Sequence, residues 1–532
     1  MLFLTFIEVK RSLLLNLITA SLFLPISCQE IPTPTPFETF LSGRDTIFDL
    51  AILNGVVVDG LGSEPINSDV LVTGDTIAFV GYIDTTLAKI TQIIHAQERI
   101  ICPGFIDPHA HGDPMSDESF ENFLAMGVTT ILLGQDGSSS VQQGNSALEY
   151  LAAVEDRPLL LNVAFLAGHG SIRTNVGVGA KRKPDAIEIR NMQQVLKESL
   201  EAGCFGMSTG LEYVPGMYAD RFELVELAKT VGAYEGIIMS HMRSEDEDEI
   251  DLSIDELASQ GEYCRVHISH LKVVYGKGRE KGVQVIKKIK ALNESGIVVT
   301  ADVYPYLAGY TGISIVFPPW AKTPSTFIEA KRSRNAELRS YLKEKVLQRN
   351  GPEATLFGSG PFTGLTLAEV EKKSGKSFVD ILLELGPFGA SGAYFVMDQK
   401  LQDAFITDST IMICTDGSPT MRHPRGYGTY ARMIEDYFVR DSSITLPILI
   451  KKMTYLPAKT IGFRRRGQIA AGYAADLLIF NPSDIKERAT FVEPHRPAEG
   501  FDLVFVNGKI SWKNESIVRS DAGRLIRRNT GY

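Results

Sequence analysis

Histidines and aspartates recur in this 532-residue chain at points where short apolar segments end. His109 and His111 form an H-x-H pair directly after the apolar segment at 104–107. Side-chain direction in a strand repeats every two residues, so the two imidazoles are expected to point to the same side. Neutral imidazole is a common metal ligand. The pair alone is also compatible with two ordinary surface or core histidines.

Four more residues with ligand atoms follow other apolar segments: Asp136, His241, His270 and Asp416. His241 and His270 are 29 residues apart, the length of one strand–helix unit, so we expect them to be neighbours. Four of the nine histidines and two aspartates would then meet at one edge of the fold. Nitrogen and oxygen ligands with an open coordination position favour a catalytic Zn²⁺ or a similar divalent ion.

The segments that position these residues alternate with helical patterns, such as those at 184–202 and 221–234. Eight of them in series predict a (β/α)₈ TIM barrel, in which chemistry takes place at the C-terminal ends of the strands. They lie at 104–107, 129–133, 159–165, 204–208, 236–240, 265–269, 296–303 and 410–414.

More than 100 residues separate the last two predicted strands. Helical patterns at 335–349 and 367–385 indicate an insertion at about 312–400, before the last barrel strand and over the barrel mouth. Solvent-exposed decoration is the alternative interpretation of these helices.

Both ends of the chain are rich in short β segments. We therefore expect residues 46–100 and 461–532 to form the two parts of one small β-sandwich domain, with the barrel at 101–460 between them. The formal net charge of −10 argues against a nucleic-acid partner, which would require a basic face.

The first 28 residues have the features of a secretory signal peptide. Lys10 and Arg11 precede a short apolar run, which is too short to span a membrane. Cys28 and the Pro/Thr-rich tether at 29–45 resemble a bacterial lipoprotein cleavage site, with ordinary signal-peptidase cleavage as the alternative. We expect an exported protein of the periplasm or cell envelope, with a lipid anchor at Cys28 as its membrane contact.

Several ordered motifs carry a resemblance to a known family. The stretches are CPGFIDPHAHGD (102–113), GMSTGLEYVPG (206–216), SHMRSE (240–245), ISHLK (268–272), DVYPY (302–306) and TDGSPTMRHPRGYGTYAR (415–432). The chain resembles the amidohydrolase superfamily, and within it the N-acyl-D-amino-acid deacylases (D-aminoacylases). The resemblance implies a barrel with a small β-sandwich and metal-dependent hydrolysis of an N-acyl-D-amino acid to a carboxylate and a free D-amino acid.

The resemblance also implies roles for the residues at the strand ends. His109 and His111 match one metal half-site, His241 and His270 match the other, and Asp416 matches the catalytic acid/base, which also binds metal. The implied cofactor is Zn²⁺, as one or two ions.

Asp136 departs from the family pattern, because the deacylases usually have a cysteine ligand at this position. A carboxylate also binds or bridges zinc, but it is a harder ligand than a thiolate. We therefore include Asp136 among the ligands and expect a more exchangeable site that also accepts Mn²⁺ or Co²⁺. A turn-forming aspartate before Gly137 is the alternative.

The substrate is expected to be a small anionic molecule. Lys272 and Arg425 match family positions that bind the carboxylate of the product amino acid, a role that suits their charge. Tyr213 and Tyr304 match hydroxyl-bearing substrate contacts. The acidic run at 245–256 is interpreted as a solvated loop and helix start.

Other functions also fit parts of the sequence. A dipeptidase is close to the leading hypothesis, because a dipeptide is itself an N-acylated amino acid. A cyclic-amide hydrolase of the dihydroorotase or hydantoinase type is a further alternative, although such enzymes usually carry a carbamylated lysine where Asp136 is expected. A catalytically inactive envelope binding protein would have lost some of these ligands. The sequence carries no signal for the oligomeric state.

Overall fold

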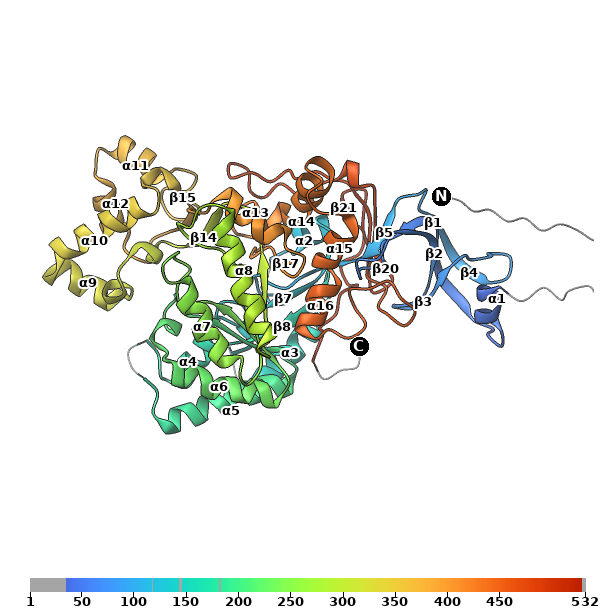
Figure 1. Cartoon of the computed structure of the whole chain (residues 1–532), viewed down its shortest axis with the longest axis horizontal. Helices are drawn as coiled ribbons and strands as arrows, with labels where there is room; N and C mark the ends of the chain where they lie inside the picture. The colour runs from blue at the N-terminus through green and yellow to red at the C-terminus, as the bar shows by residue number, and fades with distance from the viewer. Residues whose placement is uncertain (1–34, 117, 143–145, 181–182, 529–532) are drawn as a thin grey trace, which may run out of the picture.

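The computed structural model describes residues 35–116, 118–142, 146–180 and 183–528. A sheet built from both chain ends, a central strand–helix body and a helical insertion follow one another along the longest axis (Figure 1). The predicted signal peptide and residues 29–34 of the predicted tether lie outside the described residues, whereas the rest of the tether contains a short helix, α1 (Pro36–Leu41). None of the described helices has the length and apolar character needed to cross a membrane.

Parallel strands form the central body. Two hydrogen-bonded series, β6-β7-β8 and β9-β10-β11-β12-β13-β17, contain all of them. Their bounds are β6 Phe105–Asp107, β7 Val128–Leu133, β8 Asn162–Phe165, β9 Ala167–Gly168, β10 Gly206–Gly210, β11 Ile237–His241, β12 Arg265–Ile268, β13 Val299–Val303 and β17 Met412–Ile413.

The two series join into a ring at both of their ends. β8 and β9 are separated only by Leu166, whose backbone N–H donates to Leu133 at 2.9 Å. At the other junction a parallel bridge joins Ala110 to Gly417. With β8 and β9 counted as one strand, the ring has the eight strands that the sequence predicts.

Helices connect the strands of the ring and pack around it. The predicted helices at 184–202 and 221–234 correspond to α5 (Ala186–Ala202) and α6 (Arg221–Ala233). α5 begins at Asp185, whose side chain accepts from the backbone N–H groups of Ile187 and Glu188 in a capping box. The other connecting helices are α2 Glu121–Ala125, α3 Ala147–Glu155, α4 His169–Asn175, α7 Ile250–Gln260, α8 Arg279–Glu294, α13 Gln399–Thr407, α14 Arg425–Arg432, α15 Leu446–Met453 and α16 Tyr455–Ile461.

Both chain ends build one nine-stranded sheet. Its order is β21-β20-β19-β18-β5-β1-β2-β3, with β4 paired to β1, and the two ends meet where β5 pairs antiparallel with β18. The bounds are β1 Ile47–Val57, β2 Ile66–Thr73, β3 Thr76–Gly81, β4 Lys89–His95, β5 Ile100–Pro103, β18 Leu477–Phe480, β19 Phe501–Val506, β20 Lys509–Lys513 and β21 Ser516–Ile517.

A buried polar network connects this sheet to the barrel. The carboxylate of Asp476 pairs with Arg466 and accepts from the backbone N–H of Asn507 at 2.7 Å. The side chain of Asn507 donates to Asn162, in barrel strand β8, at 2.7 Å.

The insertion between β13 and β17 has a hydrophobic core of its own. It contains the antiparallel sheet β14-β16-β15 and four helices. The pattern at 335–349 predicted α10, whereas the one at 367–385 is two helices, because Gly375 ends α11 in the left-handed region with φ +68°. The bounds are β14 Ala308–Gly312, β15 Thr355–Phe357, β16 Ser391–Phe395, α9 Pro324–Ser333, α10 Asn335–Gln348, α11 Leu367–Ser374 and α12 Phe378–Leu385.

Candidate metal centre

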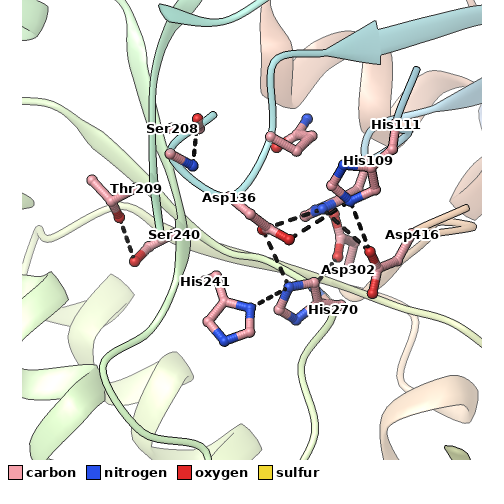
Figure 2. Close-up of polar contacts among 12 residues, drawn as sticks. His109, His111, Asp136, Ser208, Thr209, Ser240, His241, His270, Asp302 and Asp416 are labelled. Atoms are coloured by element: carbon pink, nitrogen blue, oxygen red, sulfur yellow. Dashed lines mark hydrogen bonds and ion pairs between the residues drawn. The ribbon is translucent and has the colours of Figure 1, made fainter. Parts of the chain in front are cut away.

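The residues predicted from the strand ends meet at one end of the barrel (Figure 2). One ligand atom from each of His109, Asp136, His270 and Asp416 lies within 4.8 Å of the others. These residues follow β6, β7, β12 and β17, so the ring of parallel strands brings together positions that are far apart in the sequence.

His109 provides the test of whether a metal fits this group. The side chain is fully buried, and neither of its ring nitrogens has a hydrogen-bond partner among the described residues. Buried polar atoms are nearly always satisfied, so such a nitrogen beside two carboxylates requires an explanation. Burial also lowers the pKa of His109 and favours the neutral ring that binds metals. The donor set therefore fits a divalent ion.

Asp136 lies between the two predicted halves of the site. Its Oδ1 is 3.4 Å from Nε2 of His109 and 3.4 Å from Nε2 of His270. Its Oδ2 is 3.6 Å from Nε2 of His111. Asp136 therefore lies within reach of histidines from both predicted half-sites, where it would be able to hold a metal ion.

Asp416 completes the first half of the site. Its Oδ1 lies 3.0 Å from Nε2 of His111 and 3.7 Å from Nε2 of His109. Its Oδ2 lies 2.7 Å from Nη1 of Arg425. Burial would raise the pKa of Asp416, but Arg425 and the nearby histidines hold it far below its usual value. The group is therefore an anion.

His241 belongs to a second group, with Glu245 and His270. Its Nδ1 lies 3.0 Å from Nε2 of His270, so the two predicted ligands are neighbours. Its other ring nitrogen lies 3.1 Å from Oε2 of Glu212. A carboxylate on the second nitrogen fixes the tautomer and orientation of a metal-binding histidine.

Three of the site residues have strained backbones. Asp136, His270 and Asp416 have φ values of +53°, +38° and +48°. Side chains other than glycine rarely adopt this left-handed region, and such strain gathers at functional sites. Gly137 makes the first of these turns feasible, because a Cβ there would lie 2.7 Å from the backbone nitrogen of Gly210.

His270, Glu245 and Lys272 form a compact cluster of ionisable groups, each in contact with the other two. Its Nδ1 lies 3.2 Å from Oε1 of Glu245, which also accepts from Nζ of Lys272 at 2.6 Å. Burial would lower the pKa of His270, but Asp416 and Asp136 outweigh burial and Lys272 and raise it to about 10. Burial would likewise raise the pKa of Glu245, but Lys272 and the two histidines lower it to about 2.

A cavity of about 580 Å³ opens beside these groups, within the range of small-molecule sites. It is lined by all four predicted substrate-binding residues: Tyr213, Lys272, Tyr304 and Arg425. Among the described residues, Lys272 forms an ion pair with Glu245, and Arg425 forms one with the predicted ligand Asp416. The two cations are therefore partly neutralised before a substrate binds.

The two tyrosines differ in their surroundings. The ring of Tyr213 lies 4.5 Å from that of His241, and its hydroxyl accepts from Thr311 at 3.4 Å. The hydroxyl of Tyr304 is buried and without a hydrogen-bond partner among the described residues, while Arg425 lies over its ring. Tyr304 therefore keeps a free polar group for a ligand.

Sequence reasoning missed three carboxylates that position the site: Glu212, Glu245 and Asp302. Glu245 is buried rather than part of a solvated run, because Lys272 and His270 pair with it across neighbouring strands. Asp302 accepts from the backbone N–H of His270 and binds His267 at 2.8 Å. The signal for each was its place in a motif: GLEY, HMRSE and DVYPY.

Comparison with known proteins agrees with this geometry. A model of the amidohydrolase family matches residues 398–511. N-acyl-D-glutamate deacylase of Alcaligenes xylosoxydans xylosoxydans is 30% identical over 505 residues, which are 90% of this chain and 97% of the relative. This chain belongs to the D-aminoacylase family of amidohydrolases.

Other members of the family are similar to the same extent. D-aminoacylase of Alcaligenes xylosoxydans xylosoxydans is 30% identical over 512 residues, 90% of this chain and 98% of the relative. The crystal structure of N-acyl-D-glutamate deacylase from Bordetella bronchiseptica, complexed with zinc and a phosphonate mimic of the tetrahedral intermediate, has a TM-score of 0.78. It is 26% identical and covers 91% of this chain and 100% of its own.

Proposed function

We propose that the protein is a metal-dependent hydrolase that cleaves the amide bond of N-acyl-D-amino acids to a carboxylate and a free D-amino acid. The observation that carries the proposal is the buried His109, whose ring nitrogens have no hydrogen-bond partner among the described residues, in a His/Asp group beside a substrate-sized cavity. The D-configuration is supported by the similarity to two D-specific deacylases along 90% of the chain.

His109, His111, Asp136, His241, His270 and Asp416 would hold one or two Zn²⁺ ions, with Mn²⁺ or Co²⁺ as alternatives. When bound, such an ion supplies Lewis-acid activation of water and of the scissile carbonyl. The direct support is two groups of donors that share His270, each with its ligand atoms within 4.8 Å of one another: His109, Asp136, His270 and Asp416, and His241, Glu245 and His270. His111 lies 3.0 Å from Asp416.

Asp416 is the residue that moves the proton. It is anionic and lies at the cavity wall, so its carboxylate can accept a proton from the attacking water and return it to the leaving nitrogen. Arg425, 2.7 Å from Asp416, is placed to bind the α-carboxylate and so to hold the amide beside this acid/base. The hydroxyl of Tyr304, which has no hydrogen-bond partner in the described part of the chain, can act as a hydrogen-bond donor at the same wall.

The test is to measure the zinc content of the purified protein and its hydrolysis of matched N-acetyl-D- and N-acetyl-L-amino acids, with dipeptides and dihydroorotate in parallel. We expect bound zinc and a strong preference for the D-series. Asp416→Asn should lower kcat about 100-fold or more, because general acid/base groups contribute that much. A metal-loaded protein that hydrolyses none of these compounds, or that Asp416→Asn leaves unchanged, contradicts the proposal.

We also propose that the protein is exported and processed at its N-terminus, with Cys28 as a lipid-anchored residue. The support is the basic, apolar and small-residue order of the first 28 residues, which lie outside the described part of the chain. Intact-mass measurement and fatty-acid labelling of the wild type and of Cys28→Ala test it. An unprocessed N-terminus contradicts export, and processing without label contradicts the anchor.

A further inference from the structure

Besides Lys272 and Arg425, a further cationic group faces the cavity, on the wall formed by the insertion. Arg349 caps the C-terminal end of α10, is 7% exposed and lines the same cavity as the metal ligands. Arg349 and Arg425 have different neighbours. Arg425 contacts Asp416 and the ring of Tyr304, which both belong to the barrel. Arg349 contacts Tyr275 and Tyr394 instead.

The described residues provide few partners for the hydrogen-bond donors of the Arg349 side chain. Its Nε is buried and without a hydrogen-bond partner among the described residues. Its Nη1 donates to the hydroxyl of Tyr275 at 3.4 Å, and its guanidinium lies 5.1 Å from the ring centroid of Tyr394. No carboxylate lies within 4.0 Å of it in the described part of the chain, although buried charges are ordinarily paired.

The nearby carboxylates already have other partners. Asp246, which lines the cavity, binds Lys345 at 3.2 Å, and Glu212 binds His241 at 3.1 Å. Lys322 is also buried, and burial lowers its pKa, an effect to which the charges of Lys345 and Arg349 add. Neither of these two carboxylates pairs with Arg349, so the charge of this guanidinium remains to be balanced by a ligand.

We propose that Arg349 forms a second carboxylate subsite, and that the preferred substrates are N-acyl amino acids with a second carboxylate besides the α-carboxylate. This proposal rests on the proposed function and names its substrate class. A guanidinium binds a carboxylate with paired N–H groups, and Arg349 has an unused Nε for this purpose. Val274, Ile315 and Val396 line the same cavity and belong to the hydrophobic cluster that contains Tyr394. Apolar surroundings strengthen such a pair.

The second carboxylate has two chemical sources, the amino-acid side chain and a dicarboxylic acyl group. The experiment therefore compares kcat/KM in two arms. One arm pairs N-acetyl-D-glutamate with N-acetyl-D-glutamine, which has nearly the same shape but no side-chain charge. The other arm pairs N-succinyl-D-leucine with N-acetyl-D-leucine.

We expect the dianion to be preferred about 10- to 100-fold in one arm, the range of a hydrogen bond to a charged group. That ratio should fall toward 1 in Arg349→Gln and be largely restored in Arg349→Lys, which keeps the charge. Lys343→Gln, an exposed cation on the same helix, is the matched control and should leave the ratio unchanged. Thermal melting of each variant shows whether it is folded.

Two outcomes overturn the subsite. One is equal or better hydrolysis of the neutral partner in both arms, and the other is a dianion preference that Arg349→Gln does not change. In both cases the deacylase function stands. If nothing is hydrolysed, the deacylase function fails, and calorimetric titration with N-acetyl-D-glutamate and N-acetyl-D-glutamine tests the subsite separately: weaker binding of the dianion in Arg349→Gln supports it, and equal binding contradicts it.

Discussion

At the scale of single residues, Asp136 distinguishes this metal centre. Its two oxygens lie 3.4–3.6 Å from ring nitrogens of His109, His111 and His270. A bridging carboxylate reaches both halves of the site, as the cysteine of related deacylases is expected to, but it is a harder ligand. We therefore expect the choice of metal to depend on this side chain.

We predict that Asp136→Cys makes the site more selective for zinc and slower to release it, because thiolate is the softer ligand. Metal content, measured after dialysis against a graded series of chelator concentrations, checks this. Asp136→Asn, which keeps the shape and removes the charge, should lose metal at lower chelator concentrations than the wild type. Identical retention curves for wild type and Asp136→Cys would show that Asp136 is not a ligand.

A second prediction at this scale concerns Glu212. Its Oε2 lies 3.1 Å from Nε2 of His241. Burial would raise the pKa of Glu212, but His241 holds it below its ordinary value, so the carboxylate stays ionised beside the imidazole. We expect Glu212→Gln to lower metal affinity or kcat/KM about 10- to 100-fold, the usual effect of removing the partner of a metal-binding histidine.

The control for Glu212 is Glu247→Gln, an exposed carboxylate after β11. Competition with a chromogenic chelator gives the metal affinity of both variants. If Glu212→Gln binds metal and turns over substrate as the wild type does, Glu212 does not position His241.

At the scale of elements, the strands were the part of the fold that the sequence predicted best. Each buried strand of a parallel barrel is a short apolar run, so β11 and β12 stand out clearly, and the residues after them fall at one rim. Glu245 was missed because its burial depends on Lys272, from the end of the next strand. Arg349 was missed because only the folded insertion brings the end of α10 to the cavity.

The polar network between the terminal sheet and the barrel makes a prediction at this scale. Asp476 is the carboxylate partner of the buried Arg466, and it also accepts from Asn507 and Asn162. We expect Asp476→Ala to lower the free energy of unfolding by about 3–5 kcal/mol, because it leaves a buried guanidinium without a counter-charge.

Denaturant unfolding followed by tryptophan fluorescence measures this loss. Asp484→Ala, an exposed aspartate just after β18, is the control and should change the free energy of unfolding by no more than about 0.5 kcal/mol. A loss at Asp476 as small as that at Asp484 would mean that the network does not hold the sheet to the barrel.

At the scale of the whole molecule, the metal site lies where the two series of parallel strands close into a ring. Asp416 donates its backbone N–H to His109 at 2.9 Å, and the bridge between Ala110 and Gly417 lies beside it. The ligands thus come from the first and last strands of the barrel as well as from strands between them. A bound ion would connect these strands directly, and so its effect should extend to the stability of the whole fold.

We therefore predict that removing the metal lowers the thermal midpoint of the whole protein. An ion that binds only the folded state stabilises it by about 4 kcal/mol when its free concentration is 1,000 times its Kd. For a chain of this size that corresponds to a shift on the order of 4 °C. Scanning calorimetry with and without chelator measures the shift, and added Zn²⁺ should reverse it.

The variant His109→Ala, which removes a buried ligand, should melt lower and show no further shift with chelator. If the wild type loses its metal to the chelator and its midpoint does not move, the ion does not connect the strands, and the ring closes by its backbone bridges and packing alone.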